Sequence, residues 1–423
     1  MSRSEASAAV AAKRVLGYSR WWQLVAAAVM MALVSPYQYV WSAIEGPLAV
    51  ELDASLSALG FVFTTFVVLM ALVQFPAGWW RDRYGPRAVT LVAGVLAGGG
   101  YYALSFATEL WHVYLAYAIG SLGVGMVYTV AVNTAVKWFP DRRGLTTGIG
   151  TMAFAAGSAA FIPYVRYAAA GGALDAAFAN MGLLICAGIV LGTVVLTDPP
   201  DDWYGVHDRD VDEADASRGA AGDHTPDGGI VEYDWRAMVR TWQFWAMYFM
   251  FFAVAAAGLM ITARVILYAE HAGLAALVAT AAAAILPLAS GGGRLVVGAL
   301  SDRFDRERIT AVSFTGCGLA TLSIVGFASV GLPVGYVVAV AVAVFLWSSQ
   351  FSLFPSLVAD YYGARHSSAN YSLVYSAKMW GGVFGGGVVG WLVGVVGWDA
   401  AFLIGGVLAL AAGLTGFFLR PPP

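Results

Sequence analysis

Charged residues are scarce in this chain of 423 residues, because Asp, Glu, Lys and Arg together make up only 12% of it. A soluble globular protein carries about 25% charged residues, so an ordinary water-exposed surface is excluded. Cysteine is also scarce: Cys186 and Cys317 lie in separate apolar runs, and no CxxC pair or His cluster adjoins either one. The sequence therefore predicts no disulfide framework and no metal site, and we expect no cofactor.

The arrangements that enzymes use for nucleophilic catalysis are missing as well. Serine and threonine occur within the expected helices without a neighbouring base, as helix-packing residues do, and no nucleophile is arranged with its base. The histidines all fall in loops or at expected helix ends: His112, His207, His224, His271 and His366. The chain is therefore not expected to be an enzyme or to bind nucleic acid. A membrane-embedded enzyme or a binding sensor remains the alternative from a different class.

Long apolar runs are what the chain has instead. Hydrophobic residues make up 60% of it, and its mean hydropathy is +0.72. A membrane helix needs about 20 apolar residues, which predicts an all-α membrane protein with twelve transmembrane helices in a lipid bilayer. These are expected near residues 22–43, 57–77, 88–107, 111–133, 145–166, 175–196, 242–263, 276–297, 309–328, 334–357, 370–392 and 398–418.

The distribution of Lys and Arg predicts the orientation. Nineteen of the 23 cations fall in the terminal segments and in the loops on the same side of the expected membrane, whereas Arg166 and Arg264 lie on the opposite side. Positively charged loops remain in the cytoplasm. We therefore expect a multi-pass protein of the plasma membrane with both termini in the cytoplasm.

One long polar stretch, residues 197–240, separates six expected helices from six others. Twelve of the 26 acidic residues lie in it. The sequence predicts an N-terminal bundle over 1–196, an acidic cytoplasmic linker over 197–240 and a C-terminal bundle over 241–423. We interpret the linker as a solvated tether that contributes little to the fold.

Glycine recurs every fourth residue in the eleventh expected helix, at Gly382, Gly386, Gly390 and Gly394. This spacing puts the four glycines on one face of a helix. It predicts a bare stripe against which a neighbouring backbone can pack closely.

Two similar loops occur 220 positions apart, over residues 78–87 and 298–306, and each follows a long apolar run. A repeat of this length predicts a membrane carrier built from two homologous halves. Asp82 and Asp302 occupy matching positions, and such carboxylates can bind helix N-termini and arginines. We interpret the loops as gates on the cytoplasmic side, with Arg83, Arg87, Arg303 and Arg306 as further gating residues.

Two cations lie deep inside apolar runs. Arg294 precedes Asp302 by eight residues, and Lys378 follows Asn370 by eight, so each lies about 12 Å into a hydrocarbon core roughly 30 Å thick. No carboxylate occurs at matching depth. The counter-charge is then expected to come from the substrate, an anion, although hydrogen bonds to backbone carbonyls beside a cavity are an alternative.

Further polar and aromatic residues lie at the same expected depth. Tyr39, Tyr128 and Trp347 could wall a small dry site. Gln74 lies 220 positions before Arg294, at the matching place in the other half. It either contributes to the binding site or bonds a neighbouring helix.

These motifs resemble known families. The two loops resemble the G-x-x-x-D-R-x-G-R motif of the major facilitator superfamily, although the second has Asp305 in place of the glycine. Three segments, residues 137–145, 243–245 and 370–378, resemble the oxalate:formate antiporter family in particular. The resemblance implies two six-helix bundles related by a pseudo-two-fold axis.

The resemblance also implies site residues and an activity. An arginine of helix 8 and a lysine of helix 11 bind the substrate carboxylates in that family, and Arg294 and Lys378 match them. Its pocket aromatics match Tyr39, Tyr128 and Trp347, whereas Phe351 stands where a tyrosine is expected. We therefore expect a monomeric secondary transporter that exchanges small carboxylates of the oxalate and formate type by alternating access.

Proton-coupled monocarboxylate symport is the alternative. Those related transporters also carry the helix 8 arginine, usually with an aspartate one turn before it. In this chain that position is Ser290. Because no carboxylate stands beside Arg294 to accept a proton, the sequence favours anion exchange over symport.

Overall fold

The computed structural model describes residues 12–54, 56–200, 203 and 232–422, and all regular secondary structure in these residues is helical. Eleven helices in this part of the chain are long and apolar enough to cross a membrane, and a bent pair of helices would make a twelfth span. The expectation of an all-α membrane protein is confirmed.

The first six spans lie before the linker. Their elements are α2 (Trp21–Val34), α3 (Pro36–Tyr39), α4 (Trp41–Glu51), α5 (Leu56–Tyr84), α6 (Pro86–Ala103), α7 (Leu110–Trp138), α8 (Arg143–Ala156), α9 (Ser158–Ala170) and α10 (Leu174–Val195).

The last six spans follow the short helix α12 (Trp235–Met238). They comprise α13 (Trp242–His271), α14 (Ala276–Ser301), α15 (Arg306–Ser329), α16 (Pro333–Ser348), α17 (Gln350–Tyr362), α18 (Ser367–Tyr375), α19 (Ala377–Val383), a π-helical turn η2 (Phe384–Val388), α20 (Val389–Val396) and α21 (Trp398–Gly416).

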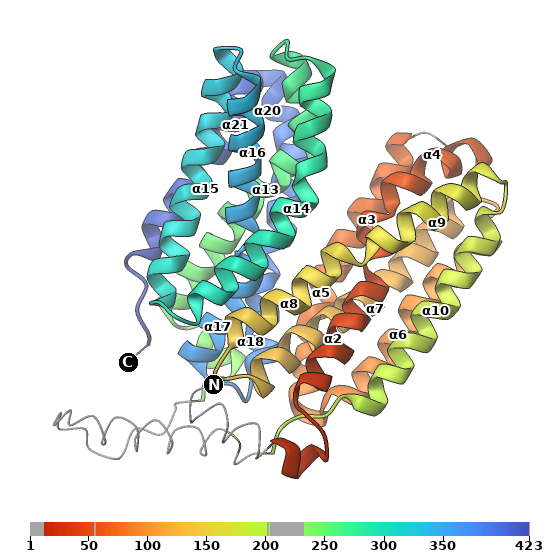
Figure 1. Ribbon diagram of the computed structural model, residues 1–423, viewed down its shortest axis with the longest axis vertical. Helices are drawn as coiled ribbons and strands as arrows, with labels where there is room; N and C mark the ends of the chain where they lie inside the picture. Colours follow the sequence, from red (N-terminus) through yellow and green to blue (C-terminus); the bar gives the residue numbers. More distant parts are fainter. Residues whose placement is uncertain (1–11, 55, 201–202, 204–231, 423) are drawn as a thin grey trace.

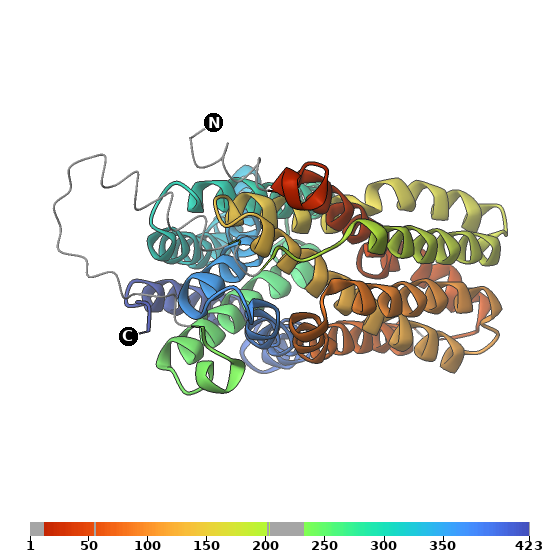
Figure 2. The same ribbon diagram turned by 90° about the horizontal axis from the view of Figure 1, so that it is seen from below.

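The helices form two bundles, α2–α10 and α13–α21, that lean against each other at one end only. Figure 1 shows them meeting at the end where α2 begins and α21 ends, and diverging toward the other end. We call the meeting end the terminal face. Seen from that face, the red-to-yellow and the green-to-blue helices lie side by side (Figure 2). The boundaries at 196 and 241 stay predictions.

Contacts between the bundles come from a few elements. Helices α5, α7 and α8 of the first bundle touch α14, α17, α18 and α19 of the second. The α8 half of the fifth span, which starts at the terminal face, touches α14 and α17, whereas its other half, α9, packs mainly on helices of its own bundle. The structure is therefore closed on the terminal face.

Several spans differ from the expected continuous runs. The first was expected to be one helix over 22–43, but its two parts, Trp21–Tyr39 and Ala43–Glu51, are bent by 50°. Pro36 begins α3 and Pro47 lies inside α4, and proline removes a helical hydrogen bond and bends the chain. The first motif is also helical up to Tyr84, and the turn comes only at Gly85, whose φ is +79°.

The predicted glycine stripe is wrong, because its face of the helix is not the one that packs closely against a neighbouring helix. A Cβ added at Gly386 or Gly394 would meet nothing within 4 Å. The close approach is made instead by Gly381 and Gly385, where an added Cβ would lie 2.6 Å from the Ala255 side chain and 2.7 Å from a backbone nitrogen of α13. These glycines stand one position earlier than the predicted pair, which is about 100° around the helix.

Candidate functional site

The two deep cations are brought to one place by α14 and α19. The guanidinium carbon of Arg294 is 4.6 Å from the centroid of the Phe351 ring, and Nζ of Lys378 is 5.3 Å from the same centroid. Both side chains are buried, with 4% and 6% of each residue exposed. Arg294 and Lys378 therefore share a single site around one aromatic ring.

A close helix crossing puts Arg294 beside that ring. A Cβ added at Gly293 would lie 1.8 Å from the carbonyl oxygen of Phe345. Because only glycine fits there, α14 can lie against α16 one residue before Arg294. Ser352 Oγ then donates to the Arg294 carbonyl at 2.7 Å, which ties α14 to α17 at the same level.

Neither cation is paired with a carboxylate within the described part of the chain. Nη1 of Arg294 donates to the carbonyl of Thr151 in α8 at 2.8 Å, and Nζ of Lys378 donates to the Tyr375 hydroxyl at 2.9 Å. The buried Nε of Arg294 has no hydrogen-bond partner among these residues. The site thus holds two charges and an unused donor.

The expected aromatic residues lie around this pair to different degrees. Trp347 is packed against Phe351 with ring centroids 5.5 Å apart, and its buried Nε1 lacks a partner among the described residues. The Tyr128 ring lies 5.1 Å from that of Tyr375. Tyr39 is more distant in this network, because its ring contact is to Phe154, 5.7 Å away.

Gln74 lies inside the same region of the bundle interface. It is fully buried, and its amide lies near the Tyr375 hydroxyl. No hydrogen bond of ordinary geometry satisfies either of its polar side-chain atoms within the described chain. A buried amide costs free energy when it is unpaired, so a polar partner for Gln74 at this level would lower that cost.

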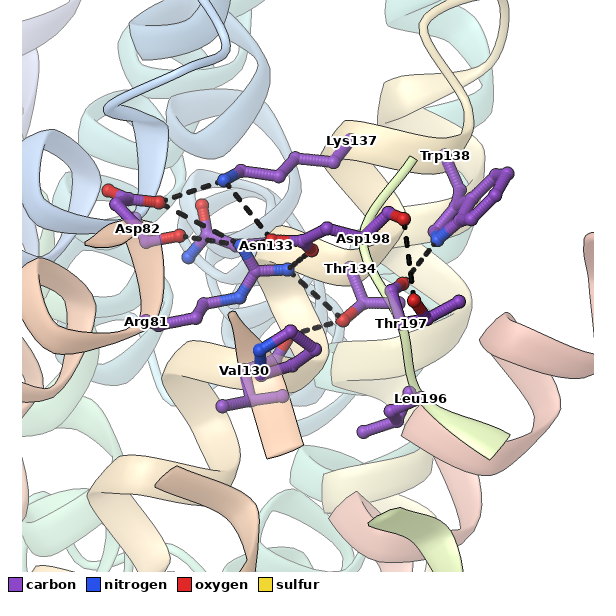
Figure 3. Close-up of polar contacts among 12 residues, drawn as sticks. Arg81, Asp82, Val130, Asn133, Thr134, Lys137, Trp138, Leu196, Thr197 and Asp198 are labelled. Atoms are coloured by element: carbon purple, nitrogen blue, oxygen red, sulfur yellow. Dashed lines mark hydrogen bonds and ion pairs between the residues drawn. The ribbon is translucent and has the colours of Figure 1, made fainter. Parts of the chain in front are cut away.

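A group of charged residues joins the bundles at the terminal face, and we call Arg81, Asp82 and Lys137 the first gate cluster. Nζ of Lys137 is 2.9 Å from Asp82 Oδ1, and Arg81 is completely buried (Figure 3). Asp82 Oδ2 accepts from the amide of Ala369 in the first turn of α18 at 3.0 Å. A carboxylate of the first bundle thereby caps a helix of the second.

The repeat of this arrangement uses Asp302, and we call Arg143, Asp302, Arg306 and Asp360 the second gate cluster. Asp302 accepts from the amides of Gly144 and Leu145 in the first turn of α8, at 2.7 and 2.8 Å. Arg306 contacts both Asp302 and Asp360. Burial raises the pKa of the Asp302 carboxyl, against the lowering effect of the two amides and Arg306.

The remaining arginines assigned to the gates are not brought into either cluster. Arg83 is exposed and lies over the rings of Trp79 and Tyr84 in its own helix. Arg87 Nε donates to the Leu196 carbonyl within the first bundle. Arg303 is exposed and makes no ion pair or side-chain hydrogen bond within the described chain. Their gating role is therefore not supported in this conformation.

Four members of the clusters are not among the gating residues that the sequence predicts: Arg81, Lys137, Arg143 and Asp360. Arg81 adjoins Asp82 in the sequence, and Arg143 lies in the segment 137–145 that resembles the antiporter family. Lys137 offered a usable signal, because the chain contains three lysines in all and this one stands at the terminal end of α7.

Two bundles of spans, a buried cationic site between them and paired gate clusters at one face define a membrane carrier. The Major Facilitator Superfamily model matches residues 24–386. The chain belongs to this family of transporters, as its motifs predicted.

Known relatives give a finer comparison. The chain is 30% identical over 407 residues to the oxalate:formate antiporter of Oxalobacter formigenes, covering 95% of this chain and 92% of that protein. It is 26% identical over 386 residues to the probable sulfoacetate transporter SauU of Cupriavidus necator, covering 88% and 87%. A solved structure of the proton:xylose symporter XylE has the same fold, with a TM-score of 0.74 at 14% identity over 95% and 96% of the chains.

Proposed function

We propose that this carrier exchanges small carboxylate anions across the plasma membrane, with its terminal face in the cytoplasm. The observation that carries the proposal is the pair Arg294 and Lys378, buried around one ring without a carboxylate partner in the described chain. The proposed orientation rests on the nineteen Lys and Arg residues that the sequence assigns to the terminal segments and to loops on one side of the membrane. A monomeric state stays a prediction.

The physical case for an anion is electrostatic. A cation near the bilayer centre costs several kcal/mol unless it is compensated, and hydrogen bonds to one carbonyl and one hydroxyl leave both charges in place. An anion would neutralise them and engage the unused Arg294 Nε and Trp347 Nε1 donors. The two relatives described above are named for small organic anions, which supports the same class.

The ring between the cations bears on which carboxylate is carried. Phe351 is 2% exposed and offers no hydroxyl, whereas the family resemblance leads one to expect a tyrosine there. A compact dianion with oxygen on both ends would lose a hydrogen bond at this ring, while a carbon substituent would gain an apolar contact. We therefore propose small carboxylates as the substrate class, without assigning oxalate itself.

The second candidate is proton-coupled symport of a monocarboxylate. Ser290, one turn before Arg294, holds the position of the aspartate in that group, and its carbonyl accepts from Ser348 Oγ at 2.8 Å. A serine cannot take up a proton at neutral pH. This supports exchange as the first candidate.

Uptake by proteoliposomes separates these possibilities. Labelled oxalate, formate, lactate or pyruvate would be offered to vesicles that are empty or preloaded with the same anion, with and without a pH gradient. Dependence on internal anion supports exchange, uptake driven by the gradient alone supports symport, and no uptake of any of them would refute the proposed substrate class.

A matched pair of variants tests the assigned site. Arg294→Gln is expected to abolish anion exchange. Arg264→Gln removes an arginine from the same bundle, where it donates to the Gly386 carbonyl away from the site, and should retain exchange. Equal exchange activity of the two variants would show that Arg294 does not bind the substrate.

A further inference from the structure

The first gate cluster has more positive charge than its own helices can balance. Arg81 and Lys137 carry two charges, and Asp82 is the single carboxylate that α5 and α7 bring to them. Arg81 is fully buried, and the Lys137 side chain is 8% exposed. An uncompensated buried cation is strongly destabilising, so a second carboxylate is required here.

Asp198, at the start of the linker, supplies that charge. Its Oδ1 is 2.8 Å from Nη2 of Arg81, and its Oδ2 is 3.7 Å from Nζ of Lys137. Figure 3 shows Asp198 reaching into the cluster from the segment that follows α10. Arg81 also donates to Ser368 Oγ in α18 at 3.2 Å, so the pair lies directly at the contact between the bundles.

The second gate cluster shows the charge balance that the first reaches with Asp198. It contains two cations, Arg143 and Arg306, and two carboxylates, Asp302 and Asp360, all of which lie in helices or at their ends. With Asp198 included, the first gate cluster also has two cations and two carboxylates. Asp198 therefore has the electrostatic role in the first cluster that Asp360 has in the second.

Neighbouring contacts hold the Asp198 backbone in place. The Thr197 carbonyl accepts from Trp138 Nε1 at 2.7 Å, and the Thr197 amide donates to Gln23 Oε1 at 3.1 Å. Trp203 packs on Trp138 with ring centroids 5.2 Å apart. The start of the linker is thus a built part of the first bundle, which corrects the interpretation as a simple tether at this end; residues 204–231 of the linker lie outside the described part of the chain.

The far end of the linker is bound to the second bundle, at the turn that leads into α18, the helix that Asp82 caps. The Glu232 carboxylate accepts from the amide of Arg365 at 3.1 and 3.3 Å. The amide of Tyr233 donates to the Tyr362 carbonyl at 3.0 Å, and Asn370 Nδ2 donates to the Tyr233 carbonyl at 2.9 Å. These contacts fix the turn between α17 and α18, whose first helical turn Asp82 caps.

We propose that the two ends of the linker are components of the gate at the terminal face. Asp198 is a positioning residue for Arg81 and Lys137, and Glu232 is a positioning residue for the turn that leads into α18. Together they stabilise the conformation closed on that face and so set how often the carrier opens there. The proposal depends on alternating access in this family and not on the identity of the substrate.

A cysteine reporter in the other repeat distinguishes opening of the whole gate from local loosening near Asp198. Thr147 in α8 is fully buried, and its hydroxyl has no partner among the described residues, so Thr147→Cys loses no hydrogen bond. Cys186 and Cys317, both free thiols, would first be replaced by alanine. Labelling by a membrane-impermeant maleimide added at the terminal face then reports opening.

Asp198→Asn is expected to raise the labelling rate about tenfold or more, because one buried cation loses its partner when the gate is shut. Asp198→Glu, which keeps the charge, should label close to the parent rate. Asp141→Asn is the matched control: Asp141 pairs with Arg20 at 2.7 Å on the same face but within the first bundle, so its loss should leave labelling unchanged.

Glu232→Gln supplies an independent variant and is also expected to raise labelling, which keeps the test valid if Asp198→Asn does not insert. Cutting an engineered protease site between 210 and 225 should leave labelling unchanged, since the anchored ends act through their own contacts. Parent-like labelling of Glu232→Gln and Asp198→Asn, or a cut that opens the gate as much as Asp198→Asn, would overturn the proposal.

Discussion

Removing the charge of Asp82 should unlock the terminal face. Asp82→Asn leaves the amide of Ala369 a possible acceptor but removes the negative charge that Lys137 contacts at 2.9 Å, while Asp198 lies farther from Lys137 at 3.7 Å. Hydrogen bonds to charged groups contribute about 1.5–3 kcal/mol each. A net loss near 2 kcal/mol for the closed state would raise the open population about 30-fold.

The assay is labelling of Thr147→Cys in the background without native cysteines. The labelling rate in Asp82→Asn should exceed the parent rate by about that factor. Transport should slow, because the carrier would spend less time closed on this face, while the binding residues stay intact.

Asp305→Asn serves as the control for this experiment. Asp305 also lies in a motif loop, but its side chain is 48% exposed and pairs only locally with Arg308. Its loss should change neither labelling nor transport. If Asp82→Asn labels at the parent rate, the capping of α18 by Asp82 does not hold the gate shut.

Three further predictions concern the site and the packing. Lys378→Gln should weaken dicarboxylate binding and let the empty carrier return, so that monocarboxylate uptake no longer depends strictly on internal anion in preloaded vesicles. Phe351→Tyr should improve competition by oxalate relative to lactate by about tenfold, the effect of one added hydrogen bond; an unchanged ratio would exclude this ring from selectivity. Gly385→Val should abolish transport and lower thermal stability in detergent, whereas Gly386→Val should be tolerated, because only the former meets α13 backbone.

Much of the fold and the cation pair could be predicted because a helix converts sequence distance into depth. Arg294 precedes Asp302 by eight residues, and this spacing predicted an arginine deep inside the protein; in the structure Arg294 is buried and shares the Phe351 ring with Lys378. Apolar runs likewise predicted twelve spans, and the described residues contain eleven such helices, or twelve if the bent pair counts as one span. Both inferences use only local geometry along one helix.

Contacts between distant segments could not be predicted in the same way. Arg81 and Asp198 lie 117 positions apart, and no periodicity encodes their pairing. The glycine stripe failed for a related reason, because four-residue spacing selects a face but does not say which face meets a neighbour. Gly381 and Gly385 have the same spacing as Gly382 and Gly386, but in the folded protein it is Gly381 and Gly385 that lie against α13.

The site and the gate are connected through the same helices. Arg294 lies in α14, which ends at Asp302, and its Nη1 bonds the Thr151 carbonyl of α8, whose first turn Asp302 caps. Lys378 is bonded to Tyr375 at the end of α18, whose first turn is capped by Asp82. Each cation is thus connected through a single helix to a different gate cluster, Arg294 through α14 and Lys378 through α18. On the proposed function, an anion that contacts both cations would act on both clusters at once, whereas an anion held by one cation would act on one. This would give a physical reason for the substrate to be required before the bundles rock.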